Sequence, residues 1–115
     1  MLLNFTNHPS IGWSSEQTNS AISSFGTIKD LLFPVIPPDY NSSELDVLVD
    51  TYFEEIMRLT PSVVHIMGEM TFTFRLVSLL KKKGIPCIAS TTARITEEQD
   101  GIKTSKFRFV QFREY

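Results

Sequence analysis

The segment "VVHIMGEMTFTF", residues 63–74, passes from an apolar run through glycine and a carboxylate into threonine and phenylalanine. Its first five residues, 63–67, have the length of a strand, and a continuous apolar run is typical of a parallel strand covered on both faces. Apolar residues then recur at helical spacing from about Thr73 to Lys83, and Gly84 ends that pattern. A buried strand that leads directly into an amphipathic helix predicts an α/β fold.

Strand and helix patterns alternate on both sides of this segment. Apolar and β-branched runs predict the strands, while capping residues, glycine and proline mark where the helices begin and end. The predicted elements are a strand in 1–6, a helix capped by Ser14 and ended by Gly26, a strand at 27–33, a helix capped by Ser42 or Ser43 and ended by Pro61, and a strand at 85–90.

The C-terminal region departs from this alternation. Asp100-Gly101 is a turn signal between two extended runs, and it predicts a β-hairpin. The whole chain, residues 1–115, is therefore predicted to form one Rossmann-like domain with an open, mostly parallel sheet and helices on both faces. We expect a strand order of about 2-1-3-4, with the hairpin extending or crossing one end of the sheet.

Composition narrows the class of protein. The chain has 115 residues and a net charge of −2, so it lacks the basic balance of proteins that grip long nucleic acids. No stretch approaches the roughly 18 apolar residues of a membrane span. The single cysteine, Cys87, allows no intrachain disulfide. These features predict a soluble, cytoplasmic protein that binds neither a membrane nor a long nucleic acid.

Sequence motifs for common cofactors are missing. The first strand is not followed by G-x-G-x-x-G, and the chain has no Walker lysine motif. One cysteine and two distant histidines do not suit a structural zinc site. We therefore predict neither a metal nor a cofactor.

The expected ligand site follows from the predicted topology. In open α/β sheets, ligands bind beyond the carboxyl ends of the strands, where the strand order reverses. Here that place lies between the first and third strands, where loops 7–13 and 68–73 meet and the loop "STTAR", residues 90–94, lies beside them. The predicted ligand-binding residues are Asn7, Ser10, Trp13, Gly68, Thr71, Thr91, Thr92 and Arg94, and the candidate catalytic residues are His8 and Glu69.

Residues of the first two loops also have purely structural interpretations. Gly68 allows a sharp turn or the close approach of a ligand. Thr71 is a candidate N-cap of the third helix, whose exposed amides attract anions, and Glu69 near that helix start is favoured by the dipole without any function. Asn7 and Ser10 are also common turn formers.

The remaining candidates carry similar alternatives. His65 lies inside a strand, so a satisfied core histidine is favoured over a catalytic one. Trp13 is either a staple that packs on the helix or a ring that stacks on a base. The hydroxyls and guanidinium of 90–94 are donors for phosphate, or they form a polar, solvated loop. Three basic residues of the last strand, Lys106, Arg108 and Arg113, are interpreted as an exposed face, with lining of the site as the less favoured alternative.

Four motifs together resemble a known family. They are "NFTNHPS", which is followed after two intervening residues by Trp13, then "HIMGEMTFTF", "STTAR" and the terminal "FVQFREY". In these motifs the chain, from Asn4 to Tyr115, resembles the short accessory proteins encoded beside type III CRISPR systems, among the Csx-type ring nucleases. The resemblance implies a Rossmann-like fold and a homodimer that binds cyclic oligoadenylate, commonly the tetra-adenylate, across the dimer axis. It also implies ring cleavage that ends the antiviral signal, although some relatives only bind the ring.

The candidate residues suit that chemistry. A ribose 2′-hydroxyl attacks the adjacent phosphorus, and the enzyme aligns the attack and stabilises charge without a metal. His8 would protonate the leaving oxygen or accept the proton of the nucleophile. Thr91, Thr92 and Arg94 would hold phosphate, and Glu69 would bind a ribose hydroxyl or an adenine amine, or act as base.

Two other functions fit the sequence. One is a non-catalytic sponge for the same cyclic oligoadenylate. The other is a protein-interaction module whose C-terminal hairpin recruits a partner. Fold alone does not separate these functions.

Overall fold

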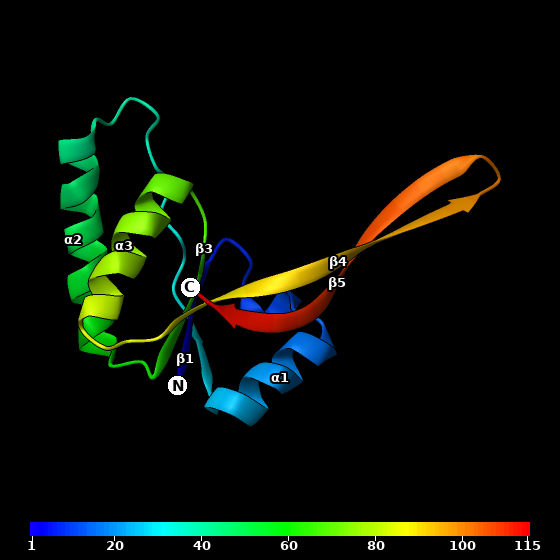
Figure 1. The fold of residues 1–115 in the computed structure, drawn as a ribbon, viewed down its shortest axis with the longest axis horizontal. Helices are drawn as coiled ribbons and strands as arrows, with labels where there is room; N and C mark the ends of the chain where they lie inside the picture. The colour runs from blue at the N-terminus through cyan, green and yellow to red at the C-terminus, as the bar shows by residue number, and fades with distance from the viewer.

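The computed structural model describes residues 1–115, and it contains one five-stranded sheet in the order β2-β1-β3-β4-β5. The first four strands of that order are parallel, and β5 pairs antiparallel with β4. The predicted order 2-1-3-4 is thus confirmed, and the hairpin extends the sheet beyond β4 (Figure 1). The strands are β1 Leu2–Thr6, β2 Ile28–Asp30, β3 Val63–Met67, β4 Cys87–Gln99 and β5 Ile102–Glu114.

Three α-helices cover the two faces of the sheet, as predicted. They are α1 Ser15–Phe25, α2 Ser42–Leu59 and α3 Met70–Lys82, with a short 3-10 helix at Ser10–Gly12. Because side chains of a strand alternate between faces, Leu3 and Phe5 of β1 join the large core under α2 and α3. Leu2 joins a smaller core with Ala21 of α1 on the opposite face. Figure 1 shows α2 and α3 on one side of the strands and α1 on the other.

The helix ends follow the predicted chemistry except at the N-caps of α2 and α3. Ser14 caps α1 by accepting a hydrogen bond from the amide of Gln17, and Gly26 ends the helix with a φ of 84°. The N-cap of α2 is Asn41 rather than Ser42 or Ser43. Its side chain and that of Glu44 each accept a bond from the other's backbone amide. This reciprocal capping box explains why the helix begins one residue earlier.

Two predicted strand boundaries are wrong. The strand expected at 27–33 pairs only over Ile28–Asp30, because Phe33 turns into the core, where it is buried, and prolines follow. The segment 90–94 is not a loop. It forms the middle of β4, which pairs with β5 from Ile88 to Gln99 with one irregularity between Thr91 and Thr92.

The hairpin of β4 and β5 projects from the body as an arm (Figure 1). The radius of gyration is 16.0 Å, whereas a compact chain of this length would have about 13 Å. Phe107 and Ile102 on the arm are 70% and 66% exposed. An isolated two-stranded ribbon is marginally stable in water, and the arm is held mainly by the pairing of its own two strands. None of the helices is both long and apolar enough to cross a membrane.

Candidate functional site

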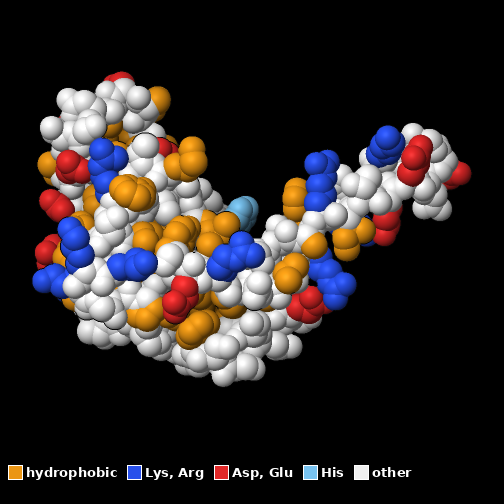
Figure 2. All heavy atoms as spheres, viewed as in Figure 1, with side chains coloured by type: hydrophobic (Ala, Val, Ile, Leu, Met, Phe, Trp, Pro, Cys, Tyr) orange, Lys and Arg blue, Asp and Glu red, His pale blue; other side chains and the backbone are white.

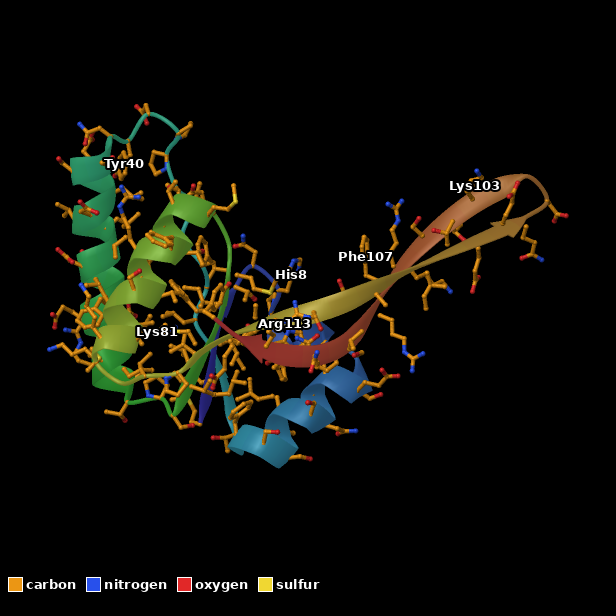
Figure 3. The ribbon with its side chains drawn as sticks, in the orientation of Figure 1. His8, Tyr40, Lys81, Lys103, Phe107 and Arg113 are labelled. Atoms are coloured by element: carbon orange, nitrogen blue, oxygen red, sulfur yellow. The ribbon has the colours of Figure 1, made fainter.

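A cleft of about 740 Å³ lies where the carboxyl ends of β1 and β3 meet the base of the arm. This is the reversal point of the strand order, and the volume suits a small-molecule ligand. Figure 2 shows the hollow between body and arm with a histidine at its edge, which Figure 3 labels as His8. The lining comes from the loop after β1, from β3, from the start of α1 and from both strands of the arm.

The structure brings half of the predicted site residues to this cleft. The lining includes Asn7, His8, Trp13, Gly68 and Thr92. The other predicted residues, Ser10, Glu69, Thr71, Thr91 and Arg94, are not among the lining residues. Loop 7–13 is therefore placed as the sequence predicted, whereas most of 68–73 and 90–94 face elsewhere.

Asn4 is the centre of a polar network beneath the cleft. Its side-chain nitrogen donates to a carboxylate oxygen of Asp30 at 2.8 Å and to the backbone carbonyl of His8 at 2.9 Å. Its side-chain oxygen therefore acts as the acceptor, and Nδ1 of His65 lies 2.9 Å from it. Because an amide oxygen can only accept, His65 carries its proton on Nδ1 and leaves the lone pair on Nε2.

Asp30 anchors both Asn4 and the first residue of the 3-10 helix. The backbone amide and the hydroxyl of Ser10 donate to its two carboxylate oxygens at 3.0 and 2.9 Å. Desolvation alone would raise the pKa of Asp30, but the hydrogen bonds from Asn4 and Ser10 outweigh it and lower the pKa. Ser10 therefore supports the loop from behind.

The backbone of His8 is held firmly while its side chain stays exposed. Its carbonyl accepts bonds from the amide of Asn4 and from the indole nitrogen of Trp13, the latter at 3.2 Å. Its backbone nitrogen donates to the hydroxyl of Thr6 at 3.1 Å. These contacts fix the position from which the imidazole of His8 projects over the cleft (Figure 3).

His65 is 2% exposed, which agrees with its predicted place in the core, but it is only half satisfied. Asn4 bonds to Nδ1, whereas no protein group bonds to Nε2. The rings of Trp13 and Phe112 pack steeply against the imidazole, each with centroids 5.4 Å away. Burial, together with the nearby charge of His8, lowers the pKa of His65 to about 4. The imidazole is thus neutral at physiological pH.

The start of α3 is occupied by the protein's own carboxylate. Glu69, and not Thr71, is the N-cap: its oxygens accept from the amides of Thr71 and Phe72 at 3.0 and 2.8 Å. Hydrogen bonds from Thr71 and Phe72 lower the pKa of Glu69. Because these amides already have an anionic partner, they are not free to bind a phosphate.

Packing against Phe33 requires glycine at position 68, a constraint that the sequence did not reveal. A Cβ at this position would lie 2.3 Å from Cζ of Phe33, so only glycine fits beneath that ring. Gly68 also lines the cleft, but the packing of Phe33 is sufficient to require it.

In the segment 90–94, the side chains of Thr91 and Arg94 are engaged within the sheet, whereas Thr92 lines the cleft. Thr91 donates to the carbonyl of Gln111, and Arg94 donates to the hydroxyl of Ser105. The cations of the cleft come instead from Lys106 and Arg108 of β5. Arg108 lies 3.5 Å from Glu16 in an exposed ion pair, whereas Lys106 forms no ion pair.

Sequence reasoning missed the network beneath the cleft. Asn4 and Asp30 lie in short strands and carry no motif, and the parallel registers that pair Asn4 with Asp30 and with His65 bring them together. A polar residue inside each of three predicted strands was the available signal. No three His, Cys, Asp or Glu side chains are grouped so that they could hold a metal ion.

Comparison with known proteins identifies the family and nothing more specific. No curated protein and no solved structure matches the chain. The family match covers residues 1–113, nearly the whole sequence. The chain belongs to the uncharacterized protein MJ1673 family.

Proposed function

We propose that the protein binds cyclic oligoadenylate, with the tetra-adenylate as the first candidate, and cleaves it without a metal by attack of a ribose 2′-hydroxyl. Cleavage would switch off signalling by a type III CRISPR system. The observation that carries the proposal is the cleft itself, where an exposed histidine, His8, and a buried one, His65, meet Lys106 at the reversal point of the sheet. The likeness of the four sequence motifs to ring nucleases supplies the substrate.

The side chains suit a phosphodiester ligand. Lys106 supplies a cation for phosphate, while Asn7 and Thr92 offer hydrogen-bonding groups and Trp13 offers a ring. A ring of four nucleotides is larger than one cleft of about 740 Å³. We therefore propose a homodimer in which two clefts face each other, since a two-fold symmetric ring matches a two-fold axis.

The proposed test is incubation of the pure protein with labelled cyclic tetra-adenylate in EDTA. Linear product ending in a 2′,3′-cyclic phosphate supports the nuclease. Retention of an intact ring would instead support a sponge, and absence of binding would refute both ligand proposals.

Two lysines of β5 give a matched pair for this test. Lys106 lines the cleft, whereas Lys103 lies near the tip of the arm (Figure 3). We expect Lys106→Ala to weaken binding of the ring and Lys103→Ala to leave it unchanged. Equal loss in both variants would indicate non-specific attraction to the arm.

A protein-interaction function has a separate observation in its favour. A second, largely apolar pocket of about 330 Å³ lies beside α3 and the C-terminus. Met70 and Phe74 of α3 border it and are 82% and 74% exposed. An apolar surface of this kind marks many docking sites, so a protein partner is the second candidate if the ring does not bind.

A further inference from the structure

Nε2 of His65 is buried without a hydrogen-bond partner, which lowers stability and is unusual in a small protein. A buried acceptor without a donor destabilises a fold by about 1–3 kcal/mol, and native structures contain few such atoms. Only two buried side-chain polar atoms here have no partner, Nε2 of His65 and the hydroxyl oxygen of Thr73. His65 borders the cleft, while Thr73 borders the apolar pocket beside α3.

The network around His65 fixes which nitrogen is free. Asp30 accepts a hydrogen bond from the side-chain nitrogen of Asn4, and the side-chain oxygen of Asn4 faces Nδ1 of His65. This chain of carboxylate, amide and imidazole holds the ring in one orientation and one tautomer. A histidine held this way presents a permanent lone pair at Nε2.

Trp13 is the residue whose movement would expose the buried imidazole of His65 to the cleft. It is half-buried, it lines the cleft, and its ring packs nearly perpendicular to that of His65. The one hydrogen bond of its side chain runs from the indole nitrogen to the carbonyl of His8, at 3.2 Å. That carbonyl keeps its bond from Asn4 when the indole moves, so displacement of Trp13 breaks a single hydrogen bond.

We propose that His65 is the general base and His8 the general acid in cleavage of cyclic oligoadenylate. The bound oligoadenylate displaces Trp13 and so reaches Nε2 of His65. This inference rests on the proposed function and assigns the proton transfers within it. It also gives the buried, half-satisfied histidine a role that core packing does not supply.

The chemical step balances with these two groups. The 2′-oxygen forms a bond to the adjacent phosphorus while its proton passes to Nε2 of His65. The bond from phosphorus to the 5′-oxygen breaks, and protonated His8 gives that oxygen its proton. The products are a 2′,3′-cyclic phosphate and a 5′-hydroxyl. A later proton exchange with water restores both imidazoles.

The environment of His65 changes in the direction that this step requires. In the free protein, burial and the charge of His8 keep its imidazole neutral, which is the form of a base. A phosphate brought into the cleft adds negative charge nearby, which favours the protonated imidazole and makes Nε2 a stronger base. Binding of the ligand thus increases the basicity of the nitrogen that accepts its 2′-hydroxyl proton.

The first experiment compares two variants that each remove a buried, unpaired polar atom. We expect His65→Phe to bind cyclic tetra-adenylate within a few-fold of the native affinity and to cleave it at least about 100-fold more slowly. Thr73→Val is the matched control, and it should cleave at the native rate. Native cleavage by His65→Phe would overturn the assignment and leave the proposed nuclease standing.

The second experiment works even if His65→Phe does not fold. In His8→Ala, which keeps the base and lacks the acid, the imidazole nitrogens are followed by ¹⁵N NMR as cyclic tetra-adenylate is added. The Nε2 resonance should move toward that of a protonated nitrogen, and the fluorescence of the sole tryptophan should change. A 2′-O-methyl analogue brings the same phosphate charge but no hydroxyl proton, so it should bind and give a smaller shift of that nitrogen than the native ligand gives.

These measurements separate the two proposals. An unchanged Nε2 resonance with the native ring bound would overturn the role of His65 while binding stands. If the wild-type protein does not bind the ring at all, both proposals fall together.

Discussion

The carboxylate of Glu69 receives both the backbone amide and the hydroxyl of Thr71, at 3.0 and 2.7 Å. This contact makes Glu69 the cap of α3 and occupies the group that a catalytic role would need. We expect Glu69→Ala to lower the free energy of unfolding by about 1 kcal/mol, measured by urea denaturation. Ring cleavage should stay within two-fold of the native rate. A tenfold loss of turnover in a folded variant would restore Glu69 as a catalytic candidate.

Gly68 lies directly beneath the ring of Phe33 and tests the packing of the core. Alanine at this position would put a methyl group 2.3 Å from Cζ of Phe33, which is 3% exposed and cannot swing into solvent. We expect Gly68→Ala to destabilise the protein by about 1–3 kcal/mol in chemical denaturation.

Gly12 is the matched control for this substitution. A Cβ there meets no atom within 4 Å, so Gly12→Ala should change stability by less than about 0.5 kcal/mol. Combining Gly68→Ala with Phe33→Leu should recover part of the loss, because the two side chains share one space. Additive effects of the two changes would show that the contact with Phe33 is not the cause.

The order of the sheet could be predicted because its signals are local and mutually consistent. The run "VVHIM" and the apolar residues of 1–6 needed only a strand of the right length, and right-handed crossovers left few orders for them. The cap of α1 was equally local. The cap of α3 was not, because glutamate and threonine stand two residues apart and either side chain can reach the free amides.

The site could be predicted only where it depends on loop position. His8 and Trp13 were found because they follow the first strand directly. His65 and Asn4 were missed as a pair because their contact joins two strands 61 residues apart in sequence. The segment 90–94 was misplaced because threonines suit both a polar loop and a strand, and the partner strand decides between them.

Acid should weaken the fold through His65. Its pKa is near 6.5 in the unfolded chain and about 4 in the folded protein, so the unfolded state binds more protons between those values. Above pH 6.5, titration of His65 should therefore leave the free energy of unfolding unchanged. It should fall by about 3 kcal/mol as the pH approaches 4.

The control for this pH dependence is the removal of the imidazole. Asn4, Trp13 and Phe112, which contact the ring, are uncharged, and the lowered pKa values of Asp30 and Glu69 place their titration at lower pH. In His65→Phe, denaturation curves at pH 7 and pH 5 should consequently give nearly equal stability. A loss as steep as that of the native protein would assign the effect to other groups.

Substitutions of Arg94 and of Lys106 test whether the sequence prediction or the observed cleft identifies the phosphate-binding residue. The sequence predicts that Arg94 holds phosphate, but its guanidinium bonds to Ser105 and does not line the cleft. Loss of a charge-assisted contact costs about 1.5–3 kcal/mol, and we expect that cost in the binding of cyclic tetra-adenylate to Lys106→Ala. Calorimetry should find Arg94→Ala unchanged. The reverse ranking would mean that the arm moves to bring Arg94 to the ring.

Exposed apolar side chains on the arm predict that the protein assembles as a dimer. Its outward apolar side chains, Ile102, Phe107 and Val110, are 66%, 70% and 57% exposed, and a two-stranded ribbon gains little stability by itself. We expect these side chains to pack against a second copy, so light scattering at micromolar concentration should give twice the mass of 13.1 kDa. Phe107→Asp should shift that mass toward the monomer.

Val35 supplies the matched control for assembly. It is 91% exposed but lies in the segment between β2 and α2, away from the arm. If the arm carries the contact, Val35→Asp stays dimeric while Phe107→Asp does not, since a buried charge at an interface costs far more than an exposed one. Phe107 also lines the cleft, so the effect of assembly on ligand binding is tested with Ile102→Asp, at a position on the arm outside the cleft. A monomeric Ile102→Asp should bind cyclic tetra-adenylate more weakly, because two clefts would be needed to enclose it. A monomeric wild-type protein that still binds and cleaves the ring would show that one cleft is sufficient and that the dimer is not part of the site.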